Sequence, residues 1–265
     1  MPKVSVIMGI YNVADTLEEA IDSILAQTFQ DFEFIICDDG STDDSLKIAR
    51  KYKKKYPDKF VILKNKKNMG LNYTLNHCLK KANGQYIARM DGDDICSADR
   101  FEKQVKLLDE HPEYAIVSSL MVLFDEHGEF RITTLVEKPE KNDFVKKTPF
   151  HHAPVMIRRE AYMSVGGYTV DKRMLRVEDV DLWFKLYGAG YKGYNIQEPL
   201  YKMRDDREAV SRRKFRYRIN ETYAKLKGYH RLGISLRYYP YAFRPIIVGL
   251  LPRPVYVYLH RKKNK

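Results

Sequence analysis

The chain has 265 residues, of which 44% are hydrophobic and 31% are charged. This composition excludes a disordered chain, and the length allows one large α/β domain with an appendage. The net charge of +12 favours a partner that carries phosphates.

The chain opens directly in a strand pattern. Residues Met1 to Met8 contain no apolar helix and no small-residue cleavage site of the kind that marks a signal peptide. The sequence therefore predicts a protein that stays in the cytoplasm.

Strand and helix patterns alternate through the first 90 residues. We expect strands at Val4–Ile10, Phe32–Cys37, Val61–Leu63 and Tyr86–Met90, with helices between them at Thr16–Ala26, Ser45–Tyr56 and Asn72–Lys81. Such alternation is typical of a Rossmann-like, mostly parallel sheet flanked by helices. Ser41 and Asp44 resemble a capping box for the second helix.

The pattern changes after residue 95. We expect a helix at Arg100–His111, strands at Ala115–Phe124 and Phe130–Leu135, and a short helix at Val180–Tyr187 that carries Trp183. Cys37, Cys78 and Cys96 are far apart and lack metal-site spacing, so reduced structural thiols are predicted.

Polar residues follow three of the predicted strands. They are Tyr11-Asn12, Asp38-Asp39-Gly40-Ser41 and Asp91-Gly92-Asp93-Asp94. Ligands of open α/β sheets bind beyond the carboxyl ends of the strands, so these turns are the candidate site.

The Asp91–Asp94 turn places three carboxylates within four positions. Their mutual repulsion is removed by a hard divalent cation such as Mg²⁺ or Mn²⁺, which also neutralises a departing diphosphate. The alternative is an acidic, solvated turn.

The other two turns suit a nucleobase. A carboxylate of Asp38 or Asp39 can accept the imide N–H of uracil or thymine, although helix capping also explains one of the two. Tyr11 can stack on the same base or simply pack against the protein.

A third acidic group lies at Glu178-Asp179-Val180-Asp181, at the start of a predicted helix. One carboxylate can serve as the general base that takes a proton from an acceptor hydroxyl. The helix dipole alone also favours acidic residues in a first turn.

The order of these motifs resembles the family 2 inverting glycosyltransferases, which have the GT-A fold. The shared features are Tyr-Asn, Asp-Asp-Gly-Ser, Asn68-Met69-Gly70, Gly84, Asp-Gly-Asp-Asp, His151-His152, Gly166-Gly167-Tyr168 and Glu178-Asp179-x-Asp-Leu-Trp, within about residues 4–205. Each motif is weak alone, but their joint order is specific.

The resemblance implies roles for individual residues. Tyr11 and Asp39 would hold the base and Asp91 the ribose, with Asn68 and Gly70 also at the nucleotide sugar. Asp93 would ligate Mn²⁺ or Mg²⁺, and Asp179 would be the catalytic base. Glu178 and Trp183 would contact the acceptor or orient its loop.

One position departs from the family pattern. A Tyr-Arg-x-His segment usually follows, and its histidine can ligate the metal, but this chain reads Tyr201-Lys202-Met203-Arg204-Asp205. Three alternatives stay open: Asp205 ligates the metal, Arg204 binds diphosphate directly, or water fills the position. His151 and His152 can also ligate metal, although ordinary hydrogen bonds are the favoured interpretation.

The excess positive charge lies at the end of the chain. Residues 204–265 contain 17 Lys and Arg against 4 Asp and Glu, a net charge of +13, which leaves −1 for residues 1–203. Tyrosines are interleaved with these cations, and the apolar run from Ile246 to Leu259 is too broken by Pro and Arg to span a bilayer. A basic, helical tail on the inner face of the membrane is predicted; a solvated basic face and nucleic-acid binding are the alternatives.

These features predict a GT-A domain over residues 1–205 and a membrane-associated tail over 206–265. The expected reaction is inverting transfer of a sugar from a nucleoside diphosphate, with UDP favoured, to a lipid-linked or cell-surface glycan; an oligomer is compatible. There are two alternative functions. One is a nucleotidyltransferase, but the sequence lacks the basic phosphate-binding loop that such an enzyme would carry after its first strand. The other is an inactive nucleic-acid-binding or membrane-binding module.

Overall fold

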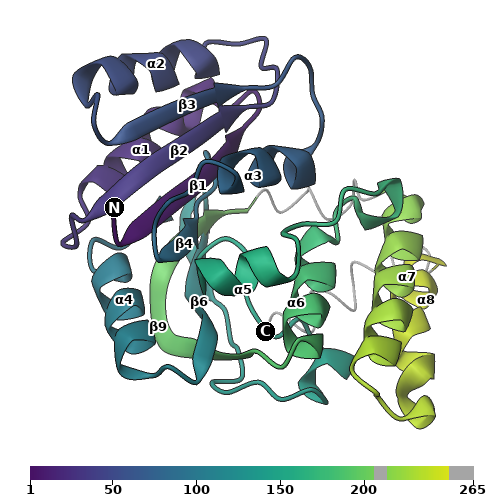
Figure 1. Ribbon diagram of the computed structural model, residues 1–265. Coiled ribbons are helices and arrows are strands. Elements are labelled where there is room, and N and C mark those ends of the chain that lie inside the picture. Colours follow the sequence, from purple (N-terminus) through teal and green to yellow (C-terminus); the bar gives the residue numbers. More distant parts are fainter. Residues whose placement is uncertain (206–213, 251–265) are drawn as a thin grey trace.

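The structure is a computed structural model and describes residues 1–205 and 214–250. Its centre is a sheet (Figure 1). The strands are β1 (Val4–Ile10), β2 (Phe32–Asp38), β3 (Phe60–Lys64), β4 (Tyr86–Arg89), β5 (Ile95–Cys96), β6 (Tyr114–Asp125), β7 (Gly128–Ile132), β8 (Met156–Arg158) and β9 (Lys192–Arg204).

The sheet has a parallel half and a mixed half. Its order is β3-β2-β1-β4-β8-β6-β9-β5, with β7 paired to β6. Strands β1 to β4 run parallel, whereas β8 pairs antiparallel with both β4 and β6. Because β1, β2 and β4 run parallel, their carboxyl ends lie side by side at one edge of the sheet.

Helices cover both faces of the sheet. Their bounds are α1 (Ala14–Leu25), α2 (Ser45–Lys55), α3 (Leu71–Leu79), α4 (Arg100–Glu110), α5 (Arg159–Ser164), α6 (Glu178–Gly188), α7 (Phe215–Arg231) and α8 (Arg244–Leu250), with 3-10 turns η1 (Asp143–Val145), η2 (Lys172–Met174) and η4 (Leu236–Phe243).

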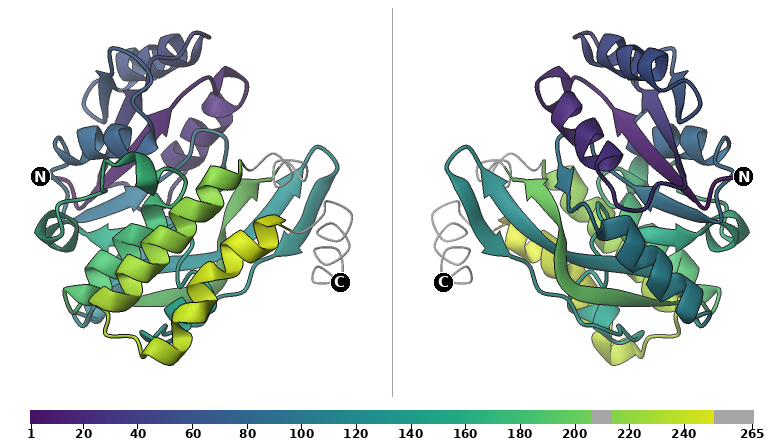
Figure 2. Two further views of the ribbon diagram at one scale, coloured as in Figure 1. Left: turned by 90° about the vertical axis from the view of Figure 1, so that its right-hand side faces the viewer. Right: turned by 90° about the vertical axis from the view of Figure 1, so that its left-hand side faces the viewer.

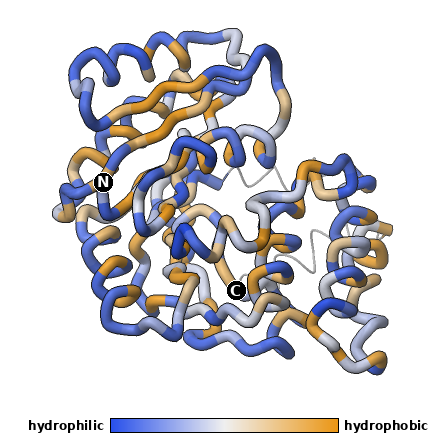
Figure 3. Tube along the Cα trace, viewed as in Figure 1, coloured by the Kyte–Doolittle hydropathy of each residue, from blue (hydrophilic) through white to orange (hydrophobic). Residues whose placement is uncertain are grey.

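Strand alternation explains the two layers. Val4, Val6 and Met8 face one core with α1, α2 and α4, whereas Ile7 and Leu75 belong to the other core with α3, α5 and α6. The hydrophobic strands between polar helix surfaces are visible in Figure 3. The predicted α/β fold, a mostly parallel sheet flanked by helices, is confirmed.

The described part of the C-terminal segment packs on the domain. Helix α7 lies against α6, and α8 lies beside α7 (Figure 2). Tyr229 of α7 is fully buried and stacks edge-on against Phe184 of α6, with ring centroids 5.9 Å apart. At Gly228 the two helices touch so closely that an added Cβ would lie 2.2 Å from the Phe184 ring.

Within the described residues, the helices are too short or too polar to cross a bilayer. The predicted apolar run from Ile246 to Leu259 is described only as far as Leu250, and its remainder lies outside the described residues. The boundary predicted at 205/206 falls beside residues 206–213, which are also outside them.

One local prediction is wrong. The Ser41 hydroxyl does not cap α2; it accepts a hydrogen bond of 3.1 Å from the Asn12 N–H. Helix α2 begins at Ser45, and the side chain of Asp44 makes no capping bond. The hydroxyl instead ties the turn after β2 to the turn after β1. Cys37, Cys78 and Cys96 are buried free thiols, as predicted.

Candidate active site

The polar strand ends meet in one cavity of about 390 Å³. Parallel pairing of β1 with β2 and β4 brings the three turns together. Among the predicted site residues, those in the cavity wall are Tyr11, Asp39, Asn68, Gly70, Asp91, Asp93 and Glu178. Asp179 and Trp183 do not line it.

Asp39, one of the residues predicted to contact the nucleobase, anchors the loop that follows β3. Its Oδ1 accepts from the Met69 N–H and from the Asn65 side chain, both at 2.8 Å, and its Oδ2 accepts from the Gly70 N–H at 2.9 Å. This buried carboxylate therefore fixes the loop that carries Asn68. Oδ2 retains a lone pair for a ligand, and Tyr11 is 46% exposed beside it.

Glycine is required at the turn after β2. Gly40 has φ +80°, and a Cβ there would lie 2.9 Å from the Lys67 backbone. The turn is also braced by Asn12, whose side-chain oxygen accepts from the Thr42 N–H at 2.8 Å. The loop before Asn68 can thus approach the strand ends closely.

The acidic turn after β4 concentrates negative charge. Asp91 is paired at 2.5 Å with Arg89, which is buried. Burial and the charge of Asp91 raise the pKa of Asp93. The same two causes, with Asp93, raise the pKa of Asp94 well above its usual range. Arg89 alone therefore does not neutralise the turn.

This donor set fits a hard divalent cation. Carboxylate oxygens are preferred ligands of Mg²⁺ and Mn²⁺, and a cation would remove the cost of ionising the crowded carboxylates. Among residues 1–205 and 214–250, no group of three or more His, Cys, Asp or Glu side chains is gathered as a complete metal centre. A cation here would complete its coordination with ligand oxygens.

The start of α6 supplies the opposite wall. Glu178 is 8% exposed, and its Oε2 has no hydrogen-bond partner. Burial and the neighbouring Asp179 raise the pKa of Glu178. Burial also raises the pKa of Asp179, which is only partly exposed. Both carboxyls are therefore better proton acceptors than ordinary surface carboxylates.

Trp183 lies in the core, where its ring packs edge-on against Phe150 and His152. His152 is bonded to the Tyr168 hydroxyl at 2.7 Å and His151 to the Thr133 hydroxyl at 2.8 Å. Burial lowers the pKa of His151 to about 4. The histidines have the ordinary hydrogen bonds that the sequence analysis favoured.

The segment that departs from the family pattern forms the end of β9. Arg204 pairs with Glu19 at 3.0 Å and lies over the Phe124 ring, 4.6 Å from its centroid. Its backbone N–H donates to Asp94 at 2.8 Å. Neither Arg204 nor Asp205 lines the cavity.

Several residues of the cavity wall were absent from the predicted site, and two of them, Arg176 and Tyr217, are polar residues from its C-terminal side. Arg176 precedes the acidic start of α6, and Tyr217 belongs to α7. Arg176 had a visible signal, because it is a cation two residues before Glu178. No sequence pattern indicated that Tyr217 approaches strands that are more than 100 residues earlier.

Comparison with known proteins identifies the family. The model for "Glycosyl transferase family 2" matches residues 5–179. The chain belongs to this family.

Relatives match nearly the whole chain. A Bacillus subtilis (strain 168) protein named "Putative glycosyltransferase EpsE" is 44% identical over 99% of this chain and 94% of its own. An Escherichia coli protein named "UDP-Gal:alpha-D-GlcNAc-diphosphoundecaprenol beta-1,3-galactosyltransferase" is 32% identical over 98% and 96%, respectively.

A crystal structure of S. aureus TarS, residues 1–349, has the same fold. Its TM-score is 0.70 at 18% identity, covering 92% of this chain and 70% of that one. A Pyrobaculum calidifontis mannosyltransferase solved with GDP-Man and Mn²⁺ has a TM-score of 0.67 at 19% identity, covering 99% of this chain and 79% of that one. The predicted family and the predicted class, a glycosyltransferase, are confirmed.

Proposed function

We propose that the protein transfers a sugar, with inversion at the anomeric carbon, from a UDP-sugar to a hydroxyl of a lipid-linked or cell-surface glycan. The observation that carries the proposal is the single cavity shared by Asp39, Asp91, Asp93 and Glu178. UDP and UDP-GlcNAc occur in TarS crystal structures of the same fold, and relatives are named for UDP-sugars and diphosphoundecaprenol acceptors.

The nucleoside binds at the end nearest β1 and β2. Tyr11 stacks on the uracil ring, and Asp39 accepts the imide N–H through the lone pair that Gly70 leaves free. Asp91 accepts from the ribose, while Asn68 and Gly70 contact the nucleotide sugar. The exposure of Tyr11 and the rigid loop held by Asp39 support these roles.

Asp93 ligates Mn²⁺ or Mg²⁺. The cation supplies charge neutralisation for the departing diphosphate when it is bound. The support is the raised pKa of Asp93, caused by burial and by Asp91, in a turn with one buried cationic neighbour.

The reaction is a single displacement. The acceptor oxygen attacks the anomeric carbon, the bond from that carbon to the diphosphate oxygen breaks, and the acceptor proton passes to a carboxylate at the start of α6. We retain Asp179 as that base and place Glu178 at the acceptor. Trp183 is fully buried, so it can act only by orienting the segment that carries these carboxylates. Glu178 is the direct rival, because its unpartnered oxygen is at the cavity.

The acceptor reaches the enzyme at a membrane surface. Four exposed apolar side chains of α7 and α8 form what we call the α7–α8 patch: Phe215, Ile219, Ile247 and Leu250. Gly249 of α8 adjoins the Phe215 ring of α7, so the two helices that carry these side chains are in contact. Exposed Lys214, Arg216 and Arg244 accompany them. Apolar groups with cations suit the head-group region of an anionic bilayer on the cytoplasmic side.

The proposal is tested by screening nucleotide sugars. UDP-sugars with Mn²⁺ should raise the melting temperature and be hydrolysed slowly, whereas ADP-sugars should do neither, because adenine lacks an imide N–H for Asp39. Equal stabilisation by every base would remove the base assignment. No metal-dependent binding of any nucleoside diphosphate sugar would overturn the proposed function.

A further inference from the structure

Arg176 has an unusual backbone conformation. Its φ is +66°, in the left-handed region that favours glycine, and the other non-glycine residue with positive φ in the described chain is Asn12. Such a conformation costs free energy in a residue with a Cβ, and it persists only where the surroundings impose it.

The surroundings of Arg176 do impose it. Met174 and Val177 on either side are both buried, at 1% and 3% exposure. Asn220 of α7 donates to the Leu175 carbonyl at 3.0 Å and to the Lys172 carbonyl at 3.3 Å. With both flanks anchored, the chain turns at Arg176, and this residue remains exposed in the cavity wall.

Arg176 is a cation in a cavity wall whose other charged residues are acidic. Among the described residues that line the cavity, it is the one Lys or Arg, whereas Asp39, Asp91, Asp93 and Glu178 are acidic. Within residues 1–205 and 214–250 no carboxylate lies within ion-pair distance of it, although its charge acts on Glu178 and opposes the rise in the pKa of that carboxyl. Glycine would adopt the left-handed conformation of this turn without strain, so the backbone geometry does not explain why the residue is an arginine.

We propose that Arg176 binds a diphosphate in this cavity. Guanidinium matches phosphate oxygens with two parallel N–H donors, and these charge-assisted bonds are strong. The inference rests on the proposed function, which brings two diphosphates to the protein: that of the nucleotide donor and that of a lipid-linked acceptor. Arg204 is another basic residue near the acidic turn, but its guanidinium is held by Glu19, by the Phe124 ring and by the Asp93 carbonyl at 3.2 Å, and it does not line the cavity.

The first experiment isolates the donor. Isothermal titration calorimetry compares UDP with uridine, in the presence of Mn²⁺, on the parent protein and on Arg176→Gln. The expected result is a loss of UDP affinity of about 10- to 100-fold with uridine affinity unchanged, the usual worth of a charged hydrogen bond. Arg176→Lys should recover part of the loss, because it keeps the charge but not the paired donors.

The second experiment isolates the acceptor. The probes are a short-chain alkyl N-acetylglucosamine diphosphate and the matching alkyl N-acetylglucosaminide without phosphates. A loss by Arg176→Gln that is confined to the first probe assigns Arg176 to the acceptor, and a loss confined to UDP assigns it to the donor. Unchanged affinity of the variant for every diphosphate that the parent binds overturns the inference.

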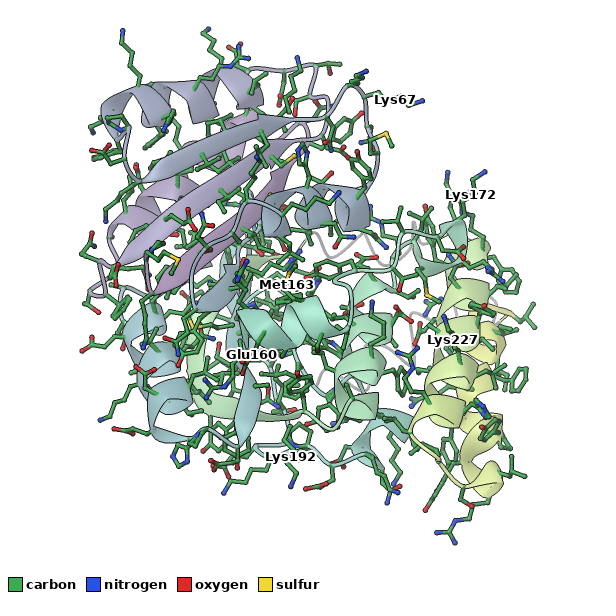
Figure 4. The ribbon with its side chains drawn as sticks, viewed as in Figure 1. Lys67, Glu160, Met163, Lys172, Lys192 and Lys227 are labelled. Atoms are coloured by element: carbon green, nitrogen blue, oxygen red, sulfur yellow. The ribbon has the colours of Figure 1, made fainter. Side chains whose placement is uncertain are left out.

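Two further variants separate binding from folding. Lys172→Gln removes an exposed cation from the adjacent η2 turn, outside the cavity wall, and should leave all affinities unchanged. Lys172 is labelled in Figure 4. Arg176→Gly should raise the melting temperature by about 2 °C through relief of the positive φ, while it weakens diphosphate binding. A lower melting temperature would mean that Arg176 stabilises the turn instead. Absence of UDP binding by the parent protein would count against the proposed function itself.

Discussion

At the residue scale, the acidic turn after β4 would link the proposed metal binding to pH. The pKa of Asp93 is raised by burial and by Asp91, so its charged form is disfavoured in the folded protein. A raised carboxyl pKa contributes stability that is present below the unfolded pKa and is lost as pH rises through the folded pKa. The proposed cation would reverse this loss, because it would favour the ionised form of Asp93.

We expect Asp93→Asn to lower Mn²⁺-dependent UDP affinity by about tenfold or more, because one anionic ligand is lost. Without metal at pH 7, the melting temperature of the variant should be no lower than that of the parent, because asparagine has no charge to bury beside Asp91. Calorimetry and melting curves with and without chelator measure both effects. Asp15→Asn, on the exposed side of α1, is the charge-matched control. If Asp93→Asn binds UDP as tightly as the parent does, both with and without chelator, the assignment of Asp93 as a metal ligand is contradicted.

The second residue-scale prediction concerns the base. Asp179→Asn should leave UDP affinity intact and lower kcat by about 10²- to 10⁴-fold, the usual worth of general base catalysis. Glu178→Gln should raise the KM for the acceptor with a smaller change in kcat. The reverse pattern in steady-state kinetics would transfer the role to Glu178, whose Oε2 is unpartnered at the cavity. Asp181 is a poor substitute, because it accepts from the Thr169 hydroxyl at 2.6 Å.

The site illustrates what sequence can predict at this scale. Asp39, Asp91 and Asp93 follow apolar strands directly, and parallel pairing fixes where such residues meet. Arg176 follows an irregular turn that is set by burial of Met174 and Val177. Its position two residues before Glu178 is visible in the sequence, but no local pattern encodes the long-range packing that places it in the cavity wall.

At the scale of elements, short regular segments with clear periodicity were predictable. Strands β1 and β2 and helices α1 to α4 lie within a few residues of their expected bounds. Strand β9 was missed, because Lys192–Arg204 contains Gly193 and Pro199 and mixes polar with apolar residues. Its pairing with β6 shifts register three times, which blurs any two-residue repeat.

The contact between α6 and α7 gives an element-scale prediction. Gly228→Ala should lower the free energy of unfolding by about 1–3 kcal/mol, because its Cβ meets the packed Phe184 ring. Gly188→Ala is the matched control at the same interface. Its nearest atoms belong to the flexible Arg231 side chain, which can move aside. Thermal or urea unfolding measures both; equal stability of the two variants would show that α7 adjusts freely.

At the scale of the whole molecule, charge and apolar exposure coincide at the C-terminal segment. We expect the full chain to co-sediment with phosphatidylglycerol vesicles but not with phosphatidylcholine alone, and to be partly released by salt because exposed charges are screened. Equal binding to anionic and neutral vesicles would contradict an electrostatic attraction between the basic residues and the lipid.

Ile247→Glu with Leu250→Glu should lower vesicle affinity by about tenfold or more, because two apolar contacts of the α7–α8 patch are lost. Ile132→Glu is the control, since this residue is 56% exposed on β7 rather than on the patch. A chain that ends at Leu250 retains α8 and α7 with its buried Tyr229, so it tests residues 251–265 separately. Undiminished sedimentation of the double variant would show that the patch does not contact lipid.

Tyr217 has a consequence for how such enzymes diverge. It lines the cavity from α7, whereas the family match ends at residue 179. The cavity is therefore assembled from a stretch of chain that the family shares and a later stretch that its model does not cover. A change confined to the later stretch would therefore reshape one wall while the strand-end turns stay intact. Under the proposed function, such a change would alter the acceptor side of the cavity and leave the nucleotide side as it is.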